Sequence, residues 1–80
     1  MDVLIENHGG SLALFTPMTP AAHQWVEGNV DVEPWQRMGA SIACEPRYLD
    51  NIIQGMQDDG LVVWWLHPVL GQLEGSENLN

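Results

Sequence analysis

The side chains that most often carry enzyme chemistry are sparse in this 80-residue chain. They are one cysteine, Cys44, and three histidines, His8, His23 and His67. A cysteine beside a histidine could act as a nucleophile with its general base, and all four side chains could in principle bind zinc. Their spacing matches neither a CxxC nor an HExxH pattern. Cys44 lies in a short apolar run, where burial keeps a thiol protonated, so we predict that it is a core residue. Since no catalytic or metal-binding pattern is present, we also predict that the protein is not an enzyme and that it binds no metal or cofactor.

Carboxylates are the abundant polar group. Eleven Asp and Glu residues accompany two Arg and no Lys, for a formal net charge of −9. Direct binding to nucleic acid needs cations that neutralise phosphates, so this composition argues against it, and against anionic membranes in the same way. An anionic surface can instead attract a basic protein. The alternative is that the carboxylates only keep a small protein soluble.

Two groups of carboxylates are candidates for binding such a partner. One lies on the outward side of a helix expected near residues 46–58, and the other follows an earlier helix. Negative charge at a helix C-terminus is unfavourable by roughly 0.3–1 kcal/mol, so local stability does not explain the presence of Asp58 and Asp59 there. The preference of Asp for the turn position before Gly is an alternative explanation. A tryptophan could serve as an aromatic anchor. The candidate partner-binding residues are Asp50, Asp58, Asp59, Glu27, Asp31, Glu33, Trp35 and Trp64.

The helix near residues 46–58 is the clearest structural signal. Apolar residues recur at i, i+3, i+4 and i+7, which predicts one buried stripe on an amphipathic helix. Pro46 suits the first turn and Gly60 suits a left-handed C-terminal cap. Apolar runs at residues 40–44 and 61–66 flank this helix and indicate short buried strands. The stripe consists of Leu49, Ile52, Ile53 and Met56.

The N-terminal half predicts a hairpin followed by a shorter helix. Residues 2–6 alternate in polarity and residues 11–15 form a second run, so residues 3–6 should pair with residues 12–15. Thr19 is a good N-cap and Pro20 a good first helical residue. This helix should run to about Glu27, with Gly28 ending it.

The expected order of elements is ββαβαβ. We predict an α+β fold in which one four-stranded mixed or mostly antiparallel sheet carries two helices on one face. The helical stripes should pack against Val3, Ile5, Ile42 and Val63. If the strands that flank the second helix are neighbours and parallel, their connection should be right-handed. We expect a single domain over residues 1–70 and a flexible polar tail over residues 71–80.

The adjacent Trp64 and Trp65 should point to opposite faces of the sheet, so only one can lie beneath the helices. The other would be exposed on the open face, which is typical of an interface, unless Val69, Leu70 and Leu73 cover it. An open apolar face predicts the alternative function, a structural or regulatory homo-oligomer such as a homodimer.

Four short motifs resemble those of a family of small proteins found in bacterial genomes, phages and plasmids. They are ENHG at residues 6–9, TPxAxxW at 19–25, EPRY at 45–48 and GMQDDGL at 55–61. The resemblance covers most of the chain up to about residue 63. It implies a bacterial setting on a mobile element, and it implies no chemistry.

Charge and setting together predict a function. Small acidic proteins of phages and plasmids often counter host defence by binding its machinery, which is an analogy of context. We therefore predict a non-enzymatic inhibitor of the anti-CRISPR or antirestriction type that binds a basic host protein or ribonucleoprotein complex. The single cysteine and the lack of a membrane-spanning apolar run favour the bacterial cytoplasm.

Overall fold

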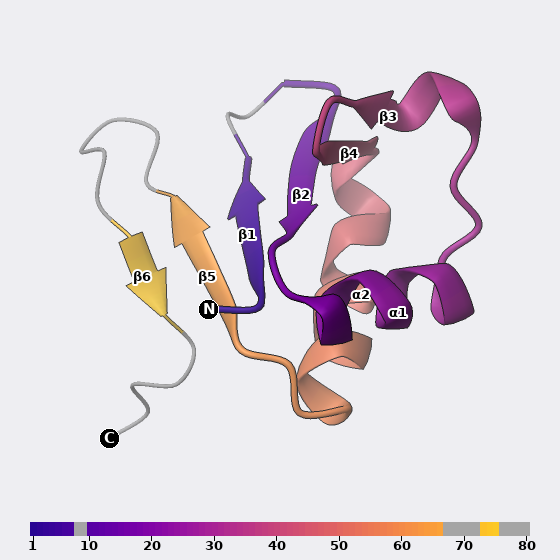
Figure 1. Ribbon diagram of the computed structural model, residues 1–80. Coiled ribbons are helices and arrows are strands. Elements are labelled where there is room, and N and C mark those ends of the chain that lie inside the picture. The colour runs from indigo at the N-terminus through magenta and orange to yellow at the C-terminus, as the bar shows by residue number, and fades with distance from the viewer. Residues whose placement is uncertain (8–9, 67–72, 76–80) are drawn as a thin grey trace.

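The computed structural model describes residues 1–7, 10–66 and 73–75. The described residues form one six-stranded sheet, two α-helices and one short 3₁₀ helix (Figure 1). In chain order the elements are β1 (Val3–Glu6), β2 (Ala13–Pro17), α1 (Pro20–Asn29), η1 (Pro34–Gln36), β3 (Arg37–Met38), β4 (Ser41–Cys44), α2 (Pro46–Asp58), β5 (Val63–Leu66) and β6 (Leu73–Gly75).

The strands form one mixed sheet in the order β3-β4-β2-β1-β5-β6. Only the β1–β5 pair is parallel among these neighbours. The predicted α+β class is confirmed, but the predicted number of four strands is wrong because β3 and β6 extend the two edges. β3 has two residues and β6 has three. Edge strands this short carry too few residues to show the alternation by which a strand is recognised in a sequence.

The N-terminal hairpin forms with a different register from the predicted one. Val3 pairs with Pro17 and Ile5 pairs with Phe15, so β2 extends two residues beyond the expected strand. This register places Ile5 and Phe15, both fully buried, opposite each other in the core. The register is shifted by two residues from the predicted one, so each side chain stays on the face of the sheet that its strand position predicts.

The strands that flank α2 are not neighbours. β4 pairs with β2, and β5 pairs with β1, so the hairpin lies between them. Both flanking strands run in the same direction, because β2 is antiparallel to β4 and to β1, and β1 is parallel to β5. Helix α2 therefore carries the chain across two intervening strands.

Helix α1 begins as predicted and ends later. The Thr19 hydroxyl accepts a hydrogen bond from the Ala22 N–H at 3.2 Å, which is the geometry of an N-cap. The helix passes through Gly28 and ends at Asn29, and the Val30 N–H donates to the Val26 carbonyl at 2.9 Å. The expected end at Glu27 is wrong, because a single glycine is tolerated within a helix at a cost of about 1 kcal/mol.

Helix α2 ends in the left-handed cap that its sequence predicts. Gly60 has a φ of +87°. The Leu61 N–H donates to the Met56 carbonyl at 2.9 Å and the Gly60 N–H donates to the Gln57 carbonyl at 3.0 Å. These two bonds form a Schellman motif, which satisfies carbonyls that the helix end would leave unpaired.

Both helices contribute to one core on a single face of the sheet. The four sheet residues predicted to face the helices are buried, at 0% exposure for Val3, Ile5 and Val63 and 3% for Ile42. Helix α1 runs across the C-terminal part of α2 (Figure 1). The buried helical residues of this core are Ala22, Val26, Leu49, Ile53 and Met56.

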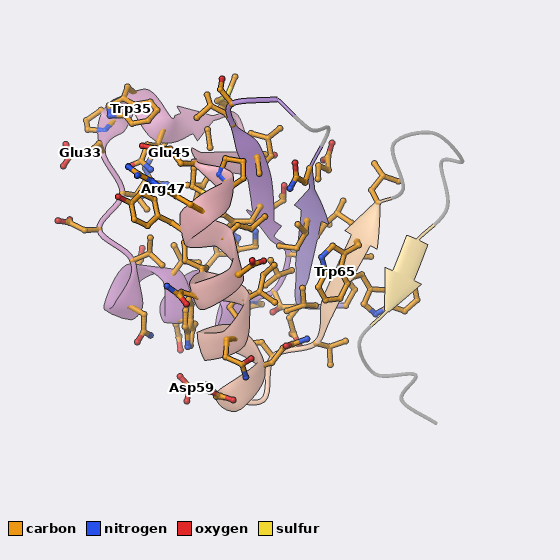
Figure 2. The ribbon with its side chains drawn as sticks, turned by 180° about the vertical axis from the view of Figure 1, so that it is seen from behind. Glu33, Trp35, Glu45, Arg47, Asp59 and Trp65 are labelled. Atoms are coloured by element: carbon orange, nitrogen blue, oxygen red, sulfur yellow. The ribbon has the colours of Figure 1, made fainter. Side chains whose placement is uncertain are left out.

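The opposite face of the sheet carries the alternate residues of each strand. Leu4, Leu14, Trp64 and Leu66 lie on it, and all four are half-buried. Trp65 lies on the helical side, next to the core (Figure 2). The two tryptophans of β5 therefore separate between the faces as strand geometry predicts. Of the residues predicted to cover this face, Val69 and Leu70 lie outside the described residues.

Three residues of the expected polar tail, Leu73–Gly75, form β6 and pair with β5. The remaining residues of that tail lie outside the described part of the chain.

Candidate functional site

Most described carboxylates lie on the two α-helices and the segments next to them, which we call the helical layer, rather than in the sheet. All six carboxylates predicted as partner-binding residues are exposed. Of the two arginines, Arg37 lies in β3 and Arg47 lies in α2. We call the following exposed residues the acidic layer: Glu27, Asp31, Glu33, Glu45, Asp50, Asp58 and Asp59.

Two members of the acidic layer stabilise the helices. The Asp59 carboxylate accepts a hydrogen bond from the Trp25 indole N–H at 2.6 Å, and Asp58 accepts one from the Gln54 amide at 2.9 Å. The Trp25 ring also packs over Gly55, since a Cβ at that glycine would lie 3.0 Å from the ring. The prediction that local stability does not explain Asp59 is therefore wrong, because its carboxylate joins α2 to α1.

A pocket of about 370 Å³ opens between the end of α1, η1 and the first half of α2. Its buried lining includes Phe15 of β2 and Cys44 of β4, and the half-buried Ile52 of α2 adjoins them. These side chains belong to the core or pack against it, so the pocket has an apolar floor on a rigid support.

The exposed lining of this pocket consists of aromatic and acidic side chains and two amides, Asn29 and Asn51. Trp35 is 65% exposed and Tyr48 is 51% exposed. The carboxylates of Asp31 and Glu45 lie in the same lining. We call these four residues the pocket rim, and they come from the loop after α1, from η1 and from the start of α2.

The short helix η1 fixes the position of Trp35. The Gln36 side chain accepts a hydrogen bond from the Glu33 N–H at 2.7 Å and donates one to the Ala43 carbonyl at 3.0 Å. Gln36 thereby attaches the turn to β4. Trp35 lies between these anchored residues and projects outward at the top of the acidic layer (Figure 2).

Glu45, Arg47 and Tyr48 form a local group at the start of α2. The Arg47 Nε lies 2.9 Å from Glu45 Oε2, and the guanidinium carbon lies 4.8 Å from the centroid of the Tyr48 ring. This ion pair joins two residues that flank Pro46 in the sequence. Both partners are well exposed, so this pair adds at most about 1 kcal/mol to stability.

Cys44 lies on the pocket floor with 5% exposure. Burial raises the pKa of its thiol, which disfavours the reactive thiolate. His23 is exposed on α1, and His8 and His67 lie outside the described residues. Within the residues described, no three His, Cys, Asp or Glu side chains gather as a metal site would require.

The structure brings together only some of the predicted site residues. Asp31 and Trp35 line the same pocket, and Glu27 lies with Asp31 in a shallow hollow beside it. Trp64 lies on the opposite face of the sheet, so it does not join the acidic layer. Sequence reasoning missed Tyr48 as a member of this site, although its spacing of four residues from Ile52 places both on one side of α2.

Comparison of the chain with protein-family models, with curated proteins and with solved structures found no match. The resemblance of the four motifs to a phage and plasmid family therefore stays a prediction. No helix within the described residues is both long enough and apolar enough to cross a membrane.

Proposed function

We infer that this chain is a non-enzymatic binding protein whose acidic layer engages a cationic protein partner. The single observation that supports this most strongly is the partition of charge between the two layers. Seven exposed carboxylates lie in the helical layer, named above, while the strands on the other side present mainly apolar residues. A carboxylate surface of this kind attracts and orients a basic protein at long range.

The partner class follows from the same charge. Proteins that handle nucleic acid hold phosphates in grooves of lysine and arginine, and carboxylates can occupy such grooves in place of phosphates. We therefore propose an inhibitor of a nucleic-acid-handling host system, of the anti-CRISPR or antirestriction type, carried by a mobile element. The predicted partner is a basic host protein or ribonucleoprotein complex in the bacterial cytoplasm.

The test is capture of partners from bacterial lysate by the immobilised full chain, after nuclease treatment, at low and at moderate salt. The expected result is a nucleic-acid-handling protein with a basic surface, whose retention falls as salt screens the charges. The triple variant of Glu27→Gln, Asp31→Asn and Asp50→Asn should lose most of this retention. Glu6→Gln, a neutralisation in the sheet, should change it little. Equal retention by the triple variant and the wild type would refute the proposal.

The open sheet face supports a second candidate, a structural or regulatory homo-oligomer. Leu4, Leu14 and Trp64 lie on the side of the sheet away from both helices, and they are half-buried. Apolar groups on an open face favour self-association. Sedimentation at micromolar concentration separates the two candidates, because a strict monomer excludes the oligomer. A dimer that Trp64→Ser converts to monomer would support it.

A further inference from the structure

The pocket at the N-terminal end of α2 has the size of a specific binding site. Its volume of about 370 Å³ falls at the lower end of the range typical of small-ligand pockets. The floor is formed by core residues, and the pocket rim of Asp31, Trp35, Glu45 and Tyr48 faces solvent together with Asn29 and Asn51. A site of this size holds one long side chain or one small molecule rather than an extended surface.

The chemistry of the rim selects the charge of the occupant. The aromatic rings of Trp35 and Tyr48 are 65% and 51% exposed, and the face of an aromatic ring attracts cations. Asp31 and Glu45 line the same pocket, Glu45 is already paired with Arg47, and the whole chain has a net charge of −9. Aromatic faces and carboxylates each favour a cation independently, and together they disfavour an anionic ligand.

The chain itself contains an example of this recognition. The guanidinium of Arg47 pairs with Glu45 at 2.9 Å and lies over the Tyr48 ring at 4.8 Å from its centroid. Arg47 does not belong to the pocket lining, and its contacts with Glu45 and Tyr48 do not include Trp35 or Asp31. Those two residues repeat the same combination of one aromatic ring and one carboxylate.

We propose that this pocket binds one arginine side chain of the basic partner, an inference that rests on the proposed function and makes it specific. The guanidinium stacks on Trp35 and pairs with Asp31, and its methylene groups pack over Ile52. Arginine is preferred to lysine because a planar guanidinium stacks on an aromatic ring and pairs with a carboxylate through two parallel hydrogen bonds.

The experiment titrates the isotopically labelled full chain with N-acetyl-arginine amide and follows its amide and indole signals by NMR. N-acetyl-citrulline amide, which has the same shape without the charge, is the matched control ligand. Saturable shifts are expected at the Trp35 indole N–H, whose signal is assigned by its loss in Trp35→Ala. The citrulline compound should produce no saturable shift there.

Two pocket variants and one control variant complete the test. Trp35→Ala and Asp31→Asn should each weaken binding by about fivefold, the effect of losing roughly 1 kcal/mol of cation–π or ion-pair energy. Glu6→Gln removes one negative charge in the sheet, outside the pocket lining, and should change affinity less than about twofold. Tryptophan fluorescence and thermal unfolding verify that each variant is folded.

The outcomes separate this inference from the broader proposal. Equal shifts with both ligands, or equal losses of affinity from Asp31→Asn and Glu6→Gln, would overturn the arginine pocket. If the chain still captured a basic protein in a salt-sensitive manner, the proposed function would stand without this pocket. If the pocket bound the arginine compound but the chain captured no basic protein, the pocket would stand and the proposed function would be refuted.

Discussion

Asp2 joins three segments that are far apart in the sequence, and replacing it tests how the fold is held together. Its carboxylate accepts one hydrogen bond from the Thr19 hydroxyl and another from the Val62 N–H, each at 2.8 Å. Thr19 is itself the N-cap of α1, and Val62 immediately precedes β5. One side chain therefore links the start of β1 to the start of α1 and to the approach to β5.

The size of the effect follows from these two bonds. Each is partly exposed and has a charged acceptor, which places its net contribution at about 1 kcal/mol. Asp2→Ala should therefore lower the free energy of unfolding by about 2 kcal/mol, which corresponds to about 8–16 °C in Tm for a domain of this size. Asp2→Asn keeps one acceptor oxygen and turns an amide N–H toward the other donor, so it should lower the free energy of unfolding by about 1 kcal/mol or more.

The effect of Asp2 should depend on pH in a defined direction. The Val62 N–H, and then the Thr19 hydroxyl, lower the pKa of the Asp2 carboxyl below its ordinary value of 3.8. Because the folded-state pKa is the lower one, the stabilisation is complete above the unfolded-state value and is lost as pH falls through the folded-state value. The stability difference between wild type and Asp2→Asn should be constant above about pH 5 and should narrow below it.

Urea unfolding followed by tryptophan fluorescence measures these differences between pH 7 and pH 3. Asp50→Asn serves as the control, because it removes one exposed negative charge from the outward side of α2. The reasoning is refuted if Asp2→Asn and Asp50→Asn have the same urea midpoint at pH 7. It is also refuted if the difference between wild type and Asp2→Asn stays constant on acidification.

Three further predictions concern the helix contact, the helix cap and the thiol. Gly55→Ala should give no gain in stability when Trp25 is present, because the new Cβ would lie 3.0 Å from the Trp25 ring, which is hydrogen-bonded to Asp59. In a Trp25→Ala background, the same substitution should raise the free energy of unfolding, measured in urea, by about 1 kcal/mol through helix propensity. A gain of that size with Trp25 present would contradict the packing argument. Gly60→Ala should lower the free energy of unfolding by about 1 kcal/mol, because the φ of +87° at this position is strained for a residue with a Cβ. An unchanged urea midpoint would argue against this cap. The native Cys44 thiol should react with Ellman's reagent at least about tenfold more slowly than in urea, and equal rates would show that the pocket floor is open.

The helices were the most predictable part of the fold. The cap at Thr19 and the left-handed turn at Gly60 were both evident, because each depends on residues within about four positions. The end of α1 at Asn29 is not evident from the sequence, because a glycine such as Gly28 can either end a helix or lie within it. The four central strands were found, but their ends and the hairpin register were displaced.

The candidate site was less predictable. The separation of Trp64 and Trp65 follows from strand geometry alone, but the faces to which they belong depend on where α2 packs. The sequence predicts Asp31 and Trp35 as parts of a partner-binding surface, and the packing of η1 on β4 brings them to one pocket with Tyr48. Sequence spacing showed neither this pocket nor the bond between Asp59 and Trp25.

The amino-acid sequence by itself determined the charge, the α+β class, the helix caps and the buried stripe of α2, because these properties depend on composition and on neighbours along the chain. The tertiary structure alone decided the strand order, the parallel pairing of β1 with β5, the two edge strands and the pocket. Short apolar strands are nearly equivalent as local patterns, so their pairing is set by which arrangement buries Phe15, Ile5 and Val63 together beneath the helices.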